Sequence, residues 1–101
     1  MRYAKGGTTY ILTNKNHTTL YTGVTSDITS RIIEHKEKHY PKSFSARYNL
    51  NILLYMEHYP TIEEAIEREK KIKAKTRKNK EILINRTNPE WKDLSNKVLN
   101  W

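Results

Sequence analysis

The sequence predicts an α/β (α+β) protein in which three short β-strands share a core with several helices. Two segments rich in β-branched and aromatic residues, 8–14 and 18–25, flank a turn-forming Asn-Lys-Asn-His sequence and predict a β-hairpin. A mostly apolar stretch, residues 51–59, predicts a third strand, and helical periodicity is found on both sides of it. With 101 residues the chain has room for one domain, which we expect to span residues 1–101.

The predicted hairpin brings two tyrosines to one face of the sheet. If its loop is symmetric about residues 15 and 16, Ile11 pairs with Leu20 and Tyr10 pairs with Tyr21. Side chains alternate between the two faces of a strand, so a shift of one residue would separate the two phenols.

A first helix is expected over residues 28–39, with Ser26 or Asp27 as its N-cap. Arg31 and His35 are four residues apart and therefore lie together beside its apolar stripe. A Tyr-Pro pair then ends the helix.

The second half of the chain predicts one strand followed by helices. Because residues 51–59 are apolar almost throughout, we expect this strand to be the central one of the sheet. Thr61 and Glu64 form a capping box that opens the next helix. A further helical stretch is predicted around residues 81–85, and the Asn-Pro pair at 88–89 predicts the start of a last helix over residues 90–101.

Glu69 is a lone carboxylate on an apolar helix face. At helical spacing it falls on the same side as Ile62, Ala65, Ile66 and Ile72. A carboxylate directed into the protein needs a cationic partner, either a metal ion or a basic side chain such as Lys73, and periodicity favours neither. Residues 68–80 contain eight basic residues and only this one acid, which suggests a site that faces phosphate groups.

Composition narrows the class of partner. The formal net charge of +8 predicts a positive surface field that attracts polyanions, and nucleic acid is the leading candidate. Cysteine is absent, which excludes disulfides and thiolate metal sites. No apolar run is long enough to cross a bilayer, so we expect a cytoplasmic protein with no membrane partner, and no obligate protein partner is evident. Charge alone leaves an enzyme and a passive binding protein equally favoured.

The order of these features resembles the GIY-YIG nuclease superfamily, and in particular its small stand-alone bacterial members. The first motif falls on residues 9–11 and the second on residues 21–23, while Arg31 and Glu69 stand where the family has its helix arginine and metal-binding glutamate. The closing residues 88–94 are also similar, so the resemblance covers nearly the whole chain. Thr9 replaces the glycine of the first motif and Thr22 the isoleucine of the second.

The resemblance implies a central three-stranded antiparallel sheet flanked by helices, and a metal-dependent endonuclease that hydrolyses DNA, with RNA as the other candidate substrate. It implies that Glu69 holds one divalent ion, Mg²⁺ or Mn²⁺. Tyr10 would then be the general base, provided that Arg31 and the metal lower its pKa. Tyr21 would position water or phosphate, the Arg31 fork would bind the scissile phosphate, and His35 would assist proton movement or substrate orientation.

Simpler interpretations exist for each of these residues. The tyrosines could only pack across the sheet, and Arg31 could pair with Asp27. The chain would then be a non-catalytic nucleic-acid-binding module on the same fold or, less favoured, a basic module for an acidic protein. Either nucleic-acid hypothesis assigns phosphate contacts to the basic run, at Lys70, Lys71, Lys73, Lys75 and Arg77.

Overall fold

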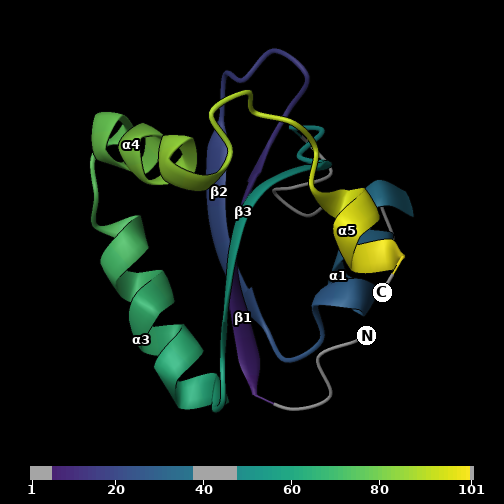
Figure 1. Cartoon of the computed structure of the whole chain (residues 1–101), viewed down its shortest axis with the longest axis vertical. Coiled ribbons are helices and arrows are strands. Elements are labelled where there is room, and N and C mark those ends of the chain that lie inside the picture. The colour runs from purple at the N-terminus through teal and green to yellow at the C-terminus, as the bar shows by residue number, and fades with distance from the viewer. Residues whose placement is uncertain (1–5, 38–47, 101) are drawn as a thin grey trace.

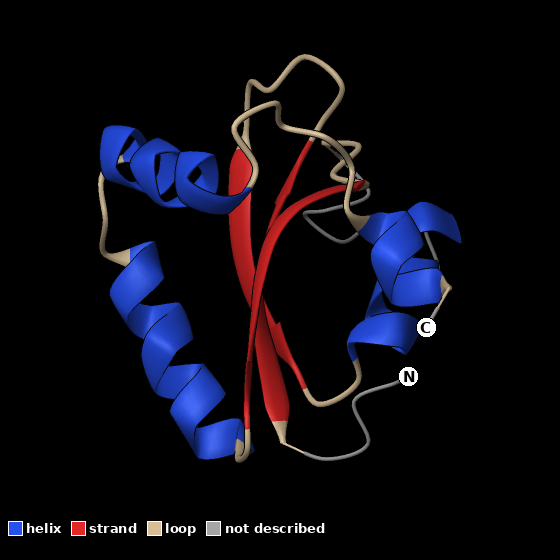
Figure 2. Cartoon of the chain, in the orientation of Figure 1, coloured by secondary structure: helices blue, strands red, loops and turns tan. Residues whose placement is uncertain are grey.

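Three antiparallel strands lie between two pairs of helices in the computed structural model, which describes residues 6–37 and 48–100 (Figure 1). Helices α3 and α4 cover one face of the sheet, and α1 and α5 cover the other (Figure 2). The described elements are β1 (Gly7–Thr13), β2 (Leu20–Thr25), α1 (Ile28–Glu37), β3 (Ile52–Tyr59), α3 (Ile62–Lys73), α4 (Arg77–Thr87) and α5 (Ser95–Leu99). No helix in these ranges is long and apolar enough to cross a membrane.

The central strand is β1, and the prediction that residues 51–59 form the central strand is wrong. The strand order is β2-β1-β3, and every residue of β1 is buried. The threonines of β1 can lie in the centre because their hydroxyls are bonded: Thr9 donates to Ala65 O at 2.7 Å, and Thr13 donates to Thr19 O at 2.8 Å. The apolar character of β3 reflects helices on both of its faces, since Leu53 and Leu54 belong to different core clusters.

The hairpin register differs from the predicted one by two residues. Tyr10 pairs with Gly23 and Leu12 with Tyr21, so the direct pairing of the two tyrosines is wrong. The connection spans residues 14–19, and Asn14 stabilises it by accepting a hydrogen bond from Thr18 N at 2.8 Å. A shift of two residues preserves the alternation of side chains, so both phenols still lie on the same face, as predicted.

Two core clusters fill the two sides of the sheet. The first contains Tyr10 and joins β1 and β3 to α1 and α5, through Leu12, Ile28, Ile32, Leu50, Leu53 and Val98. The second lies under α3 and α4 and consists of Ile11, Leu54, Tyr55, Ile72, Leu83 and Ile84. Trp91 and Leu94 pack against the second and first cluster respectively, so the C-terminal segment packs onto both sides of the core.

The helix starts follow the predicted caps. Asp27 Oδ1 accepts a hydrogen bond from Ser30 N at 3.2 Å at the start of α1. Thr61 Oγ1 accepts one from Glu64 N at 3.3 Å, which confirms Thr61 as the N-cap of α3; the Glu64 carboxylate accepts from the Thr61 hydroxyl at 3.0 Å. The predicted last two residues of the first helix, 38 and 39, lie outside the described residues.

The last two helices differ from prediction. α4 begins at Arg77, inside the basic run, because Thr76 caps it by accepting from Asn79 N at 3.2 Å. The predicted helix over residues 90–101 is wrong in its bounds, since within the described residues 90–100 only Ser95–Leu99 is helical. Asp93 explains the late start: its Oδ1 accepts hydrogen bonds from Leu53 N and Ser95 N, both at 3.0 Å, and so ties the preceding turn to β3.

Candidate functional site

Tyr10, Tyr21 and His35 meet on the face of the sheet that α1 covers. The ring centroids of the two tyrosines are 6.4 Å apart, and the His35 ring lies 6.0 Å from Tyr10 and 6.4 Å from Tyr21. The Tyr10 hydroxyl is 3.3 Å from His35 Nε2. The structure therefore brings together three side chains that are up to 25 residues apart in the sequence.

Burial dominates the acid–base behaviour of Tyr10, whose side chain is 2% exposed. Burial raises its pKa, and the neighbouring Tyr21 raises it further, while Arg31 acts in the opposite direction without reversing the shift. Arg31 thus lowers the pKa of Tyr10, as predicted, but the net shift is upward. The phenol is therefore a neutral hydrogen-bonding group at pH 7.

His35 is held in its neutral form. Burial lowers its pKa below the usual 6.5, and the positive charge of Arg31 lowers it further. A neutral imidazole has one ring nitrogen able to accept a proton and one able to donate it. Next to the Tyr10 hydroxyl, such a group can move a proton to or from the phenol.

Arg31 lies one helical turn before His35 on α1. Its side chain is 39% exposed, and its Nη1 is 3.8 Å from Glu34 Oε1, an ion pair that the sequence interpretation missed. The signal was present in the spacing of three residues on a helix. The side chain of Asp27, the alternative partner, accepts hydrogen bonds from Ser30 instead. The exposure of Arg31 leaves its guanidinium accessible to a phosphate group.

Glu69 is directed inward as predicted, with a side chain that is only 12% exposed. Its Oε2 is 2.8 Å from Lys73 Nζ, so the alternative pairing with this lysine is present in the structure. The hydrogen bond to Glu69 raises the pKa of Lys73, which stays charged. This pair interacts electrostatically with the tyrosines. The charge of Glu69 contributes to the raised pKa of Tyr10, and Tyr21 contributes to the raised pKa of Lys73.

The residues of the site fit one weakly held, mostly hydrated divalent ion. Mg²⁺ keeps several waters and is often bound through one or two carboxylates plus substrate phosphate. Glu69 offers one shielded carboxylate of this kind, with Lys73 on one of its two oxygens. Among the described residues no group of three or more His, Cys, Asp or Glu side chains could form an all-protein metal cage.

The predicted phosphate-binding run does not form a single surface. Arg77 donates to the carbonyls of His17 and Thr18 at 2.5 and 3.1 Å and pairs with Glu81, so it anchors α4 to the hairpin loop. Lys73 is paired with Glu69. Lys70 and Lys71 are exposed and Lys75 is half-buried, so these three are better placed than the other two to meet an external anion.

Similarity to known proteins covers most of the chain. Residues 6–82 match the family model described as the GIY-YIG catalytic domain. UPF0213 proteins from two strains of Staphylococcus epidermidis are 38% identical over 69 residues, which is 68% of this chain and 83% of each relative. The solution NMR structure of a UPF0213 protein from Bacillus halodurans aligns with a TM-score of 0.55 and 28% identity, over 89% of this chain and 94% of that one.

Proposed function

This chain belongs to the GIY-YIG family, a nuclease family, and we propose that it is a divalent-metal-dependent endonuclease that hydrolyses phosphodiester bonds of DNA in the cytoplasm. The observation that carries the proposal is the contact of Tyr10 with Tyr21 and His35. The charges of Arg31 and Glu69 also act on the pKa of Tyr10, although Glu69 comes from α3, on the other side of the sheet. A packing role for the tyrosines would not require the Tyr10 hydroxyl to meet an imidazole that burial keeps neutral.

Arg31 is suited to bind the scissile phosphate. Its fork can bind two phosphate oxygens at once, and its charge does not depend on pH in the working range. Phosphate binding would compete with the contact to Glu34, which is long at 3.8 Å and therefore weak.

Tyr10 and His35 would remove a proton from the attacking water. Because the phenol is neutral, it can act as a base only by passing its own proton on, and His35 Nε2 at 3.3 Å is placed to accept it. Tyr21 lies close enough to both rings to orient the water or a phosphate oxygen.

Glu69 would hold the divalent ion, Mg²⁺ or Mn²⁺. A bound ion of this kind supplies charge stabilisation to the phosphoryl oxygens and lowers the pKa of a coordinated water. Lys73 would share the carboxylate or turn away, which its 54% exposed side chain allows. The same ion pair favours the second candidate, a non-catalytic nucleic-acid-binding module in which Lys73 permanently neutralises Glu69.

Cleavage assays separate the two candidates. Purified protein is incubated with plasmid, single-stranded and branched DNA and with structured RNA, in Mg²⁺, in Mn²⁺ and in chelator. We expect cuts that need metal and that disappear in Tyr10→Phe and Arg31→Ala, while Tyr10→Phe retains nucleic-acid binding. Tyr48→Phe, at a 45% exposed tyrosine, is the matched control. Binding without any cut in all conditions would establish the binding module instead.

A further inference from the structure

A basic cavity lies along α3 and α4, away from the tyrosines. Its volume is about 440 Å³, and its lining combines three cations with an amide and two aliphatic side chains: Arg68, Lys75, Arg86, Asn79, Ile82 and Leu83. Among the residues that the structure describes, no carboxylate lines it. Leu83 belongs to the core cluster under α3 and α4, so the cavity lies on the opposite face of the sheet from Tyr10.

Glu57 of β3 holds Arg68 in position. Arg68 Nε is 3.1 and 3.2 Å from the two carboxylate oxygens of Glu57, which also accept hydrogen bonds from the hydroxyls of Tyr55 and Tyr59. Burial raises the pKa of Glu57, but these hydrogen bonds outweigh it and lower the pKa, so the carboxylate is ionised. Glu57 binds Arg68 through Nε, and the hydrogen bond of Arg68 with Tyr55 also contributes to the raised pKa of the guanidinium, which therefore stays charged.

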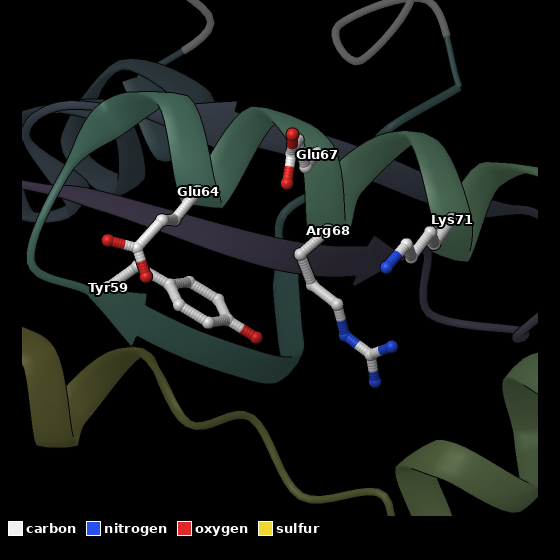
Figure 3. A pocket seen from close by; sticks show the side chains of 5 residues that line it. All are labelled: Tyr59, Glu64, Glu67, Arg68 and Lys71. Carbon is white, nitrogen blue, oxygen red and sulfur yellow. The ribbon is translucent and has the colours of Figure 1, made fainter.

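A second cavity shares Arg68 with the first one but differs from it in charge. It measures about 320 Å³ and is lined by Tyr59, Glu64, Glu67, Arg68 and Lys71. Its two carboxylates repel phosphate. Figure 3 shows the guanidinium of Arg68 extending away from α3 and apart from the carboxylates of Glu64 and Glu67. An anion would therefore meet less repulsion on the side that Arg68 shares with Lys75 and Arg86.

We propose that the cavity lined by Arg68, Lys75 and Arg86 binds a backbone phosphate of nucleic acid, on a segment other than the one that meets the tyrosines. This inference rests on nucleic acid as the ligand in the proposed function. The lining favours phosphate over a base, because it offers three positive charges and, among the described residues, no aromatic ring for stacking. Contact at two faces of the sheet suits a bent or branched nucleic acid.

The test measures binding in the absence of cleavage. A labelled DNA duplex is titrated in chelator at salt concentrations from 50 to 200 mM, with fluorescence anisotropy as the readout. The variant Lys75→Gln/Arg86→Gln removes two cations from the cavity but keeps Arg68, whose loss would leave Glu57 without its cation. The control, Lys92→Gln/Lys97→Gln, removes the same charge from exposed positions next to and within α5.

We expect the slope of log affinity against log salt to become shallower by about 0.9 in the cavity variant, the value for one lost phosphate contact on duplex DNA. The control should keep the wild-type slope. Equal slopes in the cavity variant and the wild type, or equal losses in both variants, would overturn the inference.

Two further measurements separate the sources of failure. Inorganic triphosphate is titrated while the side-chain amide of Asn79 is followed by NMR; a shift with triphosphate but not with duplex would identify a free anion and overturn the nucleic-acid assignment. Cleavage by the wild type is measured in parallel. Cuts that persist with an unaltered slope refute only the cavity site, whereas a shallower slope without any cut supports the cavity and refutes the nuclease.

Discussion

The phenol of Tyr10 lies across Gly23, its partner on strand β2. A Cβ atom at position 23 would be 2.6 Å from both Cζ and Oη of Tyr10, closer than such atoms approach in folded proteins. The absence of a side chain at Gly23 thus makes room for the phenol that reaches His35.

Gly23→Ala should therefore displace the Tyr10 ring. We expect a loss of about 1–3 kcal/mol in the free energy of unfolding, as for overpacked cores, together with loss of cleavage. Urea denaturation of Gly23→Ala, Tyr10→Leu and the double variant measures the coupling. If Gly23→Ala lowers the free energy of unfolding by the same amount in the Tyr10→Leu background as in the wild type, the contact between position 23 and Tyr10 does not cause the loss.

The two threonines that depart from the family motifs should behave oppositely. Thr22 Oγ1 is buried without a hydrogen-bond partner among the described residues, whereas Thr9 Oγ1 donates to Ala65 O at 2.7 Å. Thr22→Val should stabilise the protein by about 1 kcal/mol, and Thr9→Val should destabilise it by about as much. Both variants replace a hydroxyl by a methyl group, so their melting temperatures can be compared directly. If both melting temperatures rose, or both fell, the prediction would be contradicted.

Removing Lys73 should strengthen metal binding. The ion pair with Glu69 joins residues four apart on a helix, and its lysine is 54% exposed, so its loss should change stability by no more than about 0.5 kcal/mol. Lys73→Gln should then show a larger melting shift in Mn²⁺ than the wild type, because the carboxylate no longer shares its charge. Glu69→Gln should abolish the shift, and a shift retained in Glu69→Gln would place the ion elsewhere.

Stability should depend on pH through His35. Its pKa in the folded state is lower than the usual 6.5, so below pH 6.5 the unfolded chain binds a proton more readily than the folded one. Stability contributed by this residue is therefore lost as the pH falls from 6.5 through the lowered pKa. Urea unfolding at pH 7 and pH 5 should show a larger loss of stability for the wild type than for His35→Gln, and equal losses would argue against a half-buried imidazole with a lowered pKa.

Asn88 should be a structural residue and not a catalytic one. It is 5% exposed, and its side chain donates to Leu54 O and Lys92 O and accepts from Lys92 N. Asn88→Ala should cost about 2–3 kcal/mol, because buried backbone groups lose their partners. Cleavage per folded molecule, measured well below the melting temperature, should stay near the wild-type rate; a large fall would give Asn88 a role at the site.

Local sequence signals predicted the elements that depend on neighbouring residues. Turn chemistry and β-branched residues indicated the hairpin, Thr61 and Glu64 the start of α3, and helical spacing the inward direction of Glu69. The shared face of Tyr10 and Tyr21 was also predictable, because alternation survives a shift of two residues.

The tertiary structure decided what depends on partners far along the chain. The strand order β2-β1-β3 depends on contacts between distant elements, and the hydrogen bond from Thr9 on the central strand to Ala65, 56 residues away, is one of them. Burial is the largest cause of the pKa shifts of Tyr10 and His35. The degree of burial depends on atoms from several elements, so it is known only from the fold. The different partners of the basic residues in the run 68–80 could also be found only from the fold. Folding brings Arg77 to the hairpin loop, and it brings Lys75 close to Arg68 and Arg86. Sequence order determines which residues can share a strand or helix face, and packing of those faces determines which of them meet.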